Sequence, residues 1–150
     1  MAATQEETIK LLTTAYSMEL ETVMNYLANS VNLDGIRAEE IKKSLSAEVA
    51  DELLHAQRLA NRIKQLGGKV PGSTSVVLGG QQQPPDDTTD VVSVIKAVID
   101  AEEGAIAHYR KIIKATDGED YVTQDLCVQL LGDEEGHLIL FRGFLKEYDK

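Results

Sequence analysis

The residue types that are scarce in this sequence limit the class of protein that it can encode. Its 150 residues include one cysteine, no tryptophan and only 5% aromatic residues. A lone Cys127 cannot form an internal disulfide, which fits a reducing compartment such as the cytoplasm. The hydrophobic fraction of 43% supports a globular protein, and because aromatic rings are scarce its core must be mainly aliphatic.

Positive charge and long apolar runs are also scarce. Fifteen Lys and Arg residues stand against 25 Asp and Glu, which gives a net charge of −10. Nucleic-acid binding needs clustered basic residues, so we expect no nucleic-acid partner and instead an affinity for cations. No apolar run approaches the roughly 20 residues of a membrane span. Residues 1–7 lack the basic and then apolar layout of a signal peptide. We therefore expect a cytoplasmic protein without a membrane partner.

Apolar residues recur at helical spacing in four long segments, which predicts an all-α fold. The segment Thr4-Gln5-Glu6-Glu7 has the form of a capping box, and Gly67-Gly68 suits a helix C-terminus. Thr88 or Thr89 is the expected N-cap of the third helix. The expected helices cover about 4–33, 36–66, 88–116 and 119–148.

The connection between the second and third helices is the long one. Asp34-Gly35 and Asp117-Gly118 indicate short turns, whereas residues 67–88 are rich in Gly, Pro, Ser and Gln, with at most a short extended piece at 75–78. A helix of about 30 residues is about 45 Å long. The long loop can reach roughly 70 Å and can therefore cross the whole bundle. We expect one domain, an antiparallel four-helix bundle with a single long crossover.

A five-residue pattern occurs twice, as Asp51-Glu52-Leu53-Leu54-His55 and as Asp133-Glu134-Glu135-Gly136-His137. A Glu and a His three residues apart lie on the same side of a helix, so each pair can bind one metal ion. Both pairs interrupt the apolar stripe of their helix. A buried ionised carboxylate costs on the order of several kcal/mol unless it is paired or ligated, so this interruption indicates a functional site.

The first and third helices supply matching residues. Glu19 precedes Tyr26 by seven residues and Glu102 precedes Tyr109 by seven, so each Tyr shares a helix face with its Glu. The chain therefore reads as two copies of a helical hairpin, each with Glu, Tyr, Asp, Glu and His. The predicted metal ligands are Glu19, Glu52, His55, Glu102, Glu134 and His137.

Other polar residues are expected to support these ligands. Asp51 and Asp133 suit the role of acceptors for the ring N–H of a ligand His across the bundle. The hydroxyls of Tyr26 and Tyr109 are expected to hydrogen-bond ligand carboxylates. Glu48, one turn before Glu52, either guides metal ions inward or lies on a solvated helix face.

The chemistry of this set favours two divalent metal ions. Four Glu side chains balance the charge of two such ions, and carboxylate with imidazole suits iron, manganese or zinc. Glu102 is preferred over Glu103 because it fits the apolar stripe and the Tyr spacing. Glu134 is preferred over Glu135 because it completes the Glu-x-x-His pattern.

Two Glu-x-x-His pairs with both partner Glu and both Tyr resemble the ligand set of ferritin-like di-iron proteins. The chain is similar to bacterioferritin over most of its length, and segments 19–26, 51–56 and 120–137 carry the resemblance. It implies a ferroxidase that oxidises Fe(II) with O₂ or peroxide, for iron handling or detoxification, in which the di-metal centre itself is catalytic. It also implies a homo-oligomer, dimeric or larger.

Three features depart from bacterioferritin. Leu53 stands where that family has its haem-binding Met, so no haem is expected. The chain ends soon after His137, so the family's short fifth helix is expected to be missing. The crossover loop is longer and rich in Gln and Pro. These departures leave two alternatives: a peroxide-scavenging or oxidase enzyme without iron storage, resembling rubrerythrin in outline, or a non-enzymatic bundle that binds a metal such as zinc.

Overall fold

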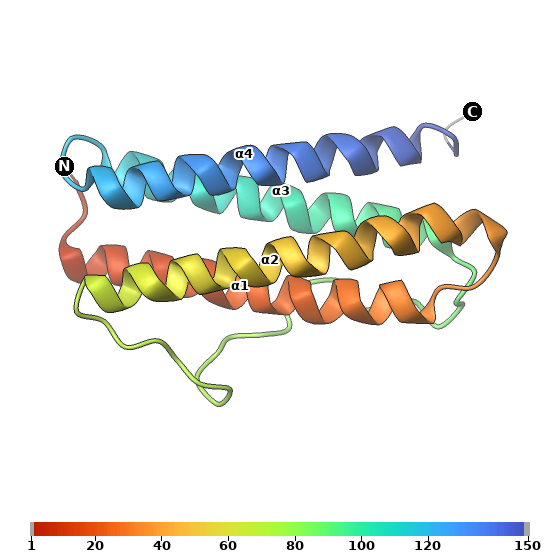
Figure 1. The fold of residues 1–150 in the computed structure, drawn as a ribbon, viewed down its shortest axis with the longest axis horizontal. Coiled ribbons are helices and arrows are strands. Elements are labelled where there is room, and N and C mark those ends of the chain that lie inside the picture. The colour runs from red at the N-terminus through yellow and green to blue at the C-terminus, as the bar shows by residue number, and fades with distance from the viewer. Residues whose placement is uncertain (1, 149–150) are drawn as a thin grey trace.

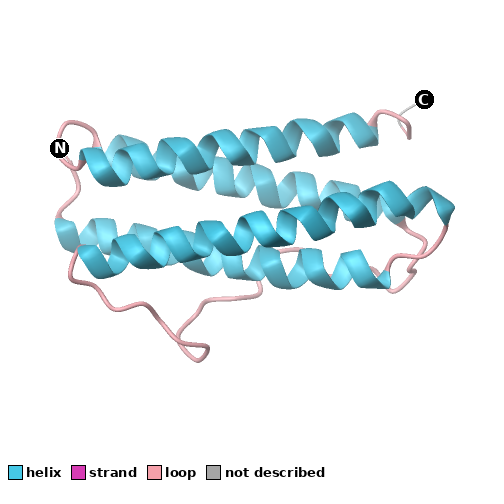
Figure 2. Ribbon diagram, in the orientation of Figure 1, coloured by secondary structure: helices cyan, strands magenta, loops and turns pink. Residues whose placement is uncertain are grey.

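Four long α helices make up most of this protein. A computed structural model describes residues 2–148. The helices lie side by side in one bundle (Figure 1), and within the described residues no strand occurs (Figure 2). Their bounds are α1 Gln5–Asn32, α2 Glu39–Gln65, α3 Val91–Thr116 and α4 Tyr121–Leu145, with a 3-10 turn, η1, at Ile36–Ala38. The predicted all-α bundle is confirmed.

The bundle consists of two antiparallel helical hairpins. α1 packs mainly on α2, and α3 packs mainly on α4. Contacts between the hairpins are fewer, and they join α1 to α3 more closely than α2 to α4. Residues 66–90 connect the far ends of α2 and α3, so these two helices run in the same direction (Figure 1). This is the predicted long crossover. Among the described helices, none has the length and apolarity needed to cross a bilayer.

The helix ends follow local signals, with one correction. The hydroxyl of Thr4 accepts from the backbone N–H of Glu7 while the Glu7 carboxylate accepts from the N–H of Thr4, which is the predicted capping box. The N-cap of α3 is Asp90 rather than Thr88 or Thr89, because the Asp90 carboxylate accepts from the N–H of Ser93. Thr88 instead donates to the carboxylate of Asp34 after α1, and Thr89 donates to the carboxylate of Asp87 in the preceding loop.

Two aliphatic clusters fill the two halves of the bundle. One contains Leu45, Val98 and Phe141, which come from α2, α3 and α4. The other contains Leu12 and Leu59 with the small buried Cys127. Between them, at mid-bundle, charged side chains take the inward positions. The helices thus hold a polar layer between two apolar ones, which shields that layer from water at both ends.

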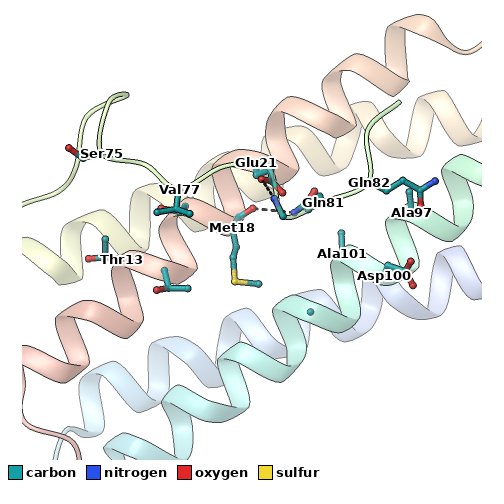
Figure 3. Close-up of a pocket in the computed structure, with 14 residues that line it drawn as sticks. Thr13, Met18, Glu21, Ser75, Val77, Gln81, Gln82, Ala97, Asp100 and Ala101 are labelled. Atoms are coloured by element: carbon teal, nitrogen blue, oxygen red, sulfur yellow. Dashed lines mark hydrogen bonds between the residues drawn. The ribbon is translucent and has the colours of Figure 1, made fainter. Parts of the chain in front are cut away.

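The crossover loop is held against α1 by a buried carboxylate. Glu21 accepts hydrogen bonds from the backbone N–H groups of Gly79 and Gly80, and the side chain of Gln81 donates to the hydroxyl of Thr22 over 2.7 Å. Figure 3 shows the cavity of about 490 Å³ that lies between this loop, α1 and α3, with Met18 in its wall. None of the predicted metal ligands lines this cavity, so the loop covers a space separate from the charged layer.

Candidate metal centre

The six predicted ligands meet at the middle of the bundle. α1 and α3 each supply one Glu, while α2 and α4 each supply a Glu and a His one helical turn apart. The four glutamates are only 1–2% exposed. Their ligand atoms form two groups, and within each group all atoms lie within 4.8 Å of one another. The groups are Glu19, Glu52, His55 and Glu134, and Glu52, Glu102, Glu134 and His137.

Two carboxylates, Glu52 and Glu134, belong to both groups. They come from equivalent positions of the two Glu-x-x-His patterns, so each hairpin supplies one shared carboxylate. A carboxylate has two oxygens and can contact two cations at once. The arrangement therefore offers two neighbouring four-ligand positions, each with one imidazole nitrogen and three carboxylates.

Both imidazole rings direct Nδ1 into the cluster. Nδ1 of His55 lies 2.8 Å from Oε1 of Glu134 and 3.6 Å from Oε2 of Glu19. Nδ1 of His137 lies 3.1 Å from Oε1 of Glu52 and 3.6 Å from Oε1 of Glu102. The rings are nearly parallel, with an interplanar angle of 18° and centroids 6.5 Å apart. Each His thus faces a different end of the same cluster.

The outer ring nitrogens face aspartates on the opposite hairpin. Nε2 of His55 lies 2.9 Å from Oδ2 of Asp133, and Nε2 of His137 lies 3.4 Å from Oδ2 of Asp51. Both aspartates are more than half exposed, at 56% and 58% of their side chains. An acceptor at Nε2 favours the tautomer that carries its proton there and leaves Nδ1 free to bind a metal ion.

The two tyrosines join the hairpins through hydrogen bonds. The hydroxyl of Tyr26 donates to Oε1 of Glu102 over 2.8 Å, and that of Tyr109 donates to Oε1 of Glu19 over 2.6 Å. Each tyrosine therefore serves the glutamate of the other hairpin rather than the one on its own helix. Burial, followed by the adjacent carboxylate charge, raises the pKa of both hydroxyls well above the usual range, so both remain protonated donors.

Without metal, the cluster shares protons between its carboxylates and imidazoles. Burial raises the pKa of Glu19 and of Glu134 well above the usual value. Burial opposes ionisation of Glu52 too, yet hydrogen bonds within the cluster hold its pKa below the usual range. Burial disfavours the charged form of His137, but Glu102 and Glu52 raise its pKa to about 11. The neighbouring carboxylates therefore favour the protonated form of the His137 imidazole.

Every predicted ligand has a buried atom that makes no hydrogen bond of good geometry, although each Nδ1 lies within ion-pair distance of a carboxylate oxygen. These atoms are Oε2 of Glu19, Oε1 of Glu52, Nδ1 of His55, Oε2 of Glu102, Oε1 of Glu134 and Nδ1 of His137. Leaving a buried polar atom unsatisfied costs about 1–3 kcal/mol. Carboxylate oxygen with imidazole nitrogen is a donor set that suits iron, manganese or zinc. The residues present therefore fit a pair of metal ions.

The neighbouring glutamates separate clearly into inner and outer residues. Glu103 pairs with Arg142 over 2.8 Å and Glu135 pairs with Arg110 over 3.4 Å, both at the surface. Glu48 is not on a solvated face, because it is only 3% exposed. Burial raises the pKa of Glu48 to about 8. Its one-turn offset from Glu52 was the sequence signal for an inward position, but that signal alone did not exclude the solvated face.

The sequence matches a known family over nearly its whole length. The model of the ferritin-like domain matches residues 9–150. Bacterioferritin of Desulfovibrio desulfuricans is 28% identical over 135 residues, which cover 89% of this chain and 71% of that protein. The DNA protection during starvation protein of Pyrococcus furiosus is 26% identical over 143 residues, which cover 93% and 77%.

Solved structures show the same fold. The bacterioferritin-related protein of Bacteroides fragilis, described as a dodecameric thioferritin, superimposes with a TM-score of 0.90 at 25% identity, covering 97% of this chain and 88% of that one. The bacterioferritin of Desulfovibrio desulfuricans, whose structure is described through its diiron site, gives a TM-score of 0.81 at 24% identity, covering 95% and 82%.

Proposed function

Because this chain belongs to the ferritin-like family, we propose that it is a di-iron ferroxidase, which oxidises Fe(II) with O₂ or peroxide in iron handling or detoxification. The observation that carries the proposal is the pair of four-ligand groups that share Glu52 and Glu134. Glu52 and Glu134 would hold two Fe(II) ions close to each other, so that both could be oxidised by one oxidant. Iron supplies that redox chemistry, which no side chain of the cluster can perform.

The side chains of the protein bind the metal ions, balance their charge and hold protons on the outer ring nitrogens. The four glutamates offset the charge of two divalent ions, and the buried setting strengthens that attraction. Asp51 and Asp133 hold the ring protons at Nε2, which keeps Nδ1 of each His available. Metal binding displaces protons from the cluster, because carboxylate and imidazole bind metals in their deprotonated forms.

The test is the rate at which the protein oxidises Fe(II). Fe(II) is added anaerobically, air or peroxide is admitted, and Fe(III) formation is followed by near-ultraviolet absorbance. Glu52→Ala and Glu134→Ala should reduce the rate to that of iron in buffer. Glu135→Ala is the matched control, because it removes a surface carboxylate next to Glu134 and should leave the rate unchanged. Wild-type rates in both shared-ligand variants would refute the proposal.

The same experiment identifies the oxidant and tests the alternatives. Faster oxidation with peroxide than with O₂ would favour a peroxide-consuming enzyme on the same residues. Elemental analysis of protein purified without added metal separates iron or manganese from zinc. Zinc with no Fe(II) oxidation would instead support a metal-binding bundle that is not an enzyme.

We also propose that the protein forms a homo-oligomer. The dodecameric description of the Bacteroides fragilis protein supports this, as do exposed apolar side chains along α1 at Met24, Leu27 and Val31. Such a stripe is typical of a surface that another subunit covers. Size-exclusion chromatography with light scattering measures the assembly, and a monomer at micromolar concentration would contradict it.

A further inference from the structure

The cavity beneath the crossover loop has no part in the metal chemistry proposed above. It measures about 490 Å³ and lies between this loop, α1 and α3 (Figure 3). Protein interiors are close-packed and contain few spaces larger than a water molecule. A space of this size falls instead within the roughly 300–1,000 Å³ that is typical of small-molecule sites. The cavity is therefore a candidate binding site, and the residues of its wall indicate the class of ligand.

Hydrogen bonds to α1 hold the loop that covers the cavity. Oε1 of Glu21 accepts from the backbone N–H groups of Gly79 and Gly80. At the next residue, the side-chain oxygen of Gln81 accepts from the side chain of Asn25 over 3.2 Å. The space is thus formed before any ligand enters it, which lowers the entropy cost of binding.

Apolar groups form much of the wall. The side chain of Met18 reaches from α1 toward α3 (Figure 3), and Val77 contributes from the loop. The α3 residues Ala97, Ala101 and Gly104 line the cavity at spacings of four and three, so they share one helix face. A Cβ atom at Gly104 would meet only the terminal methyl group of Met18, 4.0 Å away. Small residues on this face therefore leave room for an apolar body.

The polar groups of the wall are mainly hydrogen-bond acceptors. The hydroxyls of Thr13 and Thr14 donate to carbonyls of their own helix over 2.8 and 3.2 Å, so their oxygens remain available as acceptors. Ser17 also lines the cavity and is only 4% exposed, yet its hydroxyl makes no hydrogen bond within residues 2–148. A hydroxyl in that position is satisfied only by water or by a molecule in the cavity.

Two carboxylates set the charge of the cavity. Glu21 is buried, and both of its loop hydrogen bonds go to Oε1, which leaves Oε2 available to a ligand. Asp100 lines the cavity from the exposed side of α3, and the described lining residues include no lysine, arginine or histidine. We propose that this cavity binds an amphipathic amine. The carboxylates hold its protonated amino group, and Met18 and the small residues of α3 contact its apolar body. This inference goes beyond the proposed metal chemistry and does not depend on it.

The test compares three naphthalene probes that differ in charge. Isothermal titration of the protein as purified measures the binding of naphthylmethylamine, naphthylmethanol and naphthoate at neutral pH. The amine should bind once per chain and roughly 10-fold or more tightly than the alcohol, because a charge-assisted hydrogen bond is stronger than a neutral one. Naphthoate should not bind. An amine that does not bind, or that binds no more tightly than the alcohol, would refute the inference.

Gly104→Leu tests where the probes bind. The new side chain projects toward Met18 and fills the cavity, so the affinity of both the amine and the alcohol should fall roughly 10-fold or more. Gly143→Leu is the matched control, because this glycine lies on α4 outside the cavity with open space around it. Circular dichroism checks that both variants are folded. Unchanged affinity in Gly104→Leu would show that the probes bind at another place and would contradict the inference.

Asp100→Asn tests the role of charge. It keeps the shape of the side chain, so it should weaken the binding of the amine and leave that of the alcohol unchanged. Glu103→Gln is the matched control, because Glu103 lies on the same helix outside the cavity and pairs with Arg142. Unchanged amine affinity in Asp100→Asn would overturn the assignment of a cationic ligand. Fe(II) oxidation by the Glu52→Ala variant bears only on the metal centre, so the two proposals fail independently.

Discussion

The two hairpins supply the same five residue types to the site, yet their surroundings differ. At one end of the site, His55 is nearly completely buried and lies 2.9 Å from its aspartate, and the residue one turn before Glu134 is the fully buried Leu130. At the other end, His137 is more exposed and lies 3.4 Å from its aspartate, and the position equivalent to Leu130 is the carboxylate of Glu48. The repeat therefore builds two candidate metal positions that are similar in ligands but unequal in access and charge.

The largest loss of metal affinity is expected when a carboxylate that both positions share is removed. Glu52→Ala should weaken the binding of both metal ions, whereas Glu19→Ala should weaken only one, because Glu19 belongs to a single group. The loss should exceed the roughly 10–100-fold caused by changes outside the ligand shell. Titration with Co(II) measures both affinities, with Glu103→Ala as the surface control. One tight ion retained in Glu52→Ala would show that this carboxylate is not shared.

The next test substitutes the two residues that distinguish the ends of the site, and it measures the free energy of unfolding. Leu130→Ala should lower the free energy of unfolding of the metal-free protein by about 2–5 kcal/mol, because it leaves a cavity in a packed core. Glu48→Leu should have the opposite sign and raise it by about 1–4 kcal/mol, because an unpartnered buried carboxylate is replaced by an apolar side chain. Urea denaturation in the presence of a chelator measures both. Destabilisation by Glu48→Leu would mean that its carboxylate has a structural partner.

The pH dependence of stability should reveal the same asymmetry. Burial raises the pKa of Glu48 to about 8 in the folded protein from its ordinary value of 4.5. The folded state therefore keeps a proton that the unfolded chain loses, so this group's stabilising contribution falls as pH rises from about 5 to 8. Urea denaturation at several pH values in a chelator should show a smaller fall for Glu48→Leu than for the wild-type protein. An equal fall in both would exclude Glu48 as its source.

The smallest loss of metal affinity is expected when the two aspartates beside the histidines are substituted. Asp133→Asn should weaken the metal position that includes His55 by about 10-fold, near the low end for such changes because the aspartate is half exposed. Asp51→Asn should have a smaller effect, because its oxygen lies farther from His137. Competition against a metal indicator measures both affinities. Equal losses would mean that the two ends of the site are better matched than their distances indicate.

Helical periodicity predicted most of the fold because each inward residue is fixed by the geometry of its own helix. Glu102 was distinguished from Glu103 in this way, and the structure has the first inside and the second paired with Arg142 at the surface. The start of α3 was less predictable, because Thr88, Thr89 and Asp90 are all good N-cap residues. Which of them caps the helix depends on the hydrogen bonds of the preceding loop, which the sequence pattern does not contain.

The sequence by itself determined the four helices, the long crossover and the inward direction of the six ligand candidates. Only the tertiary structure decided which residues meet. In the folded protein each tyrosine hydroxyl donates to a glutamate of the other hairpin. Glu52 and Glu134 belong to both ligand groups, and Glu48 is buried. The physical reason is that periodicity fixes a side chain's direction about its own helix axis. The partner that it reaches depends on the register and spacing of the helices packed against it.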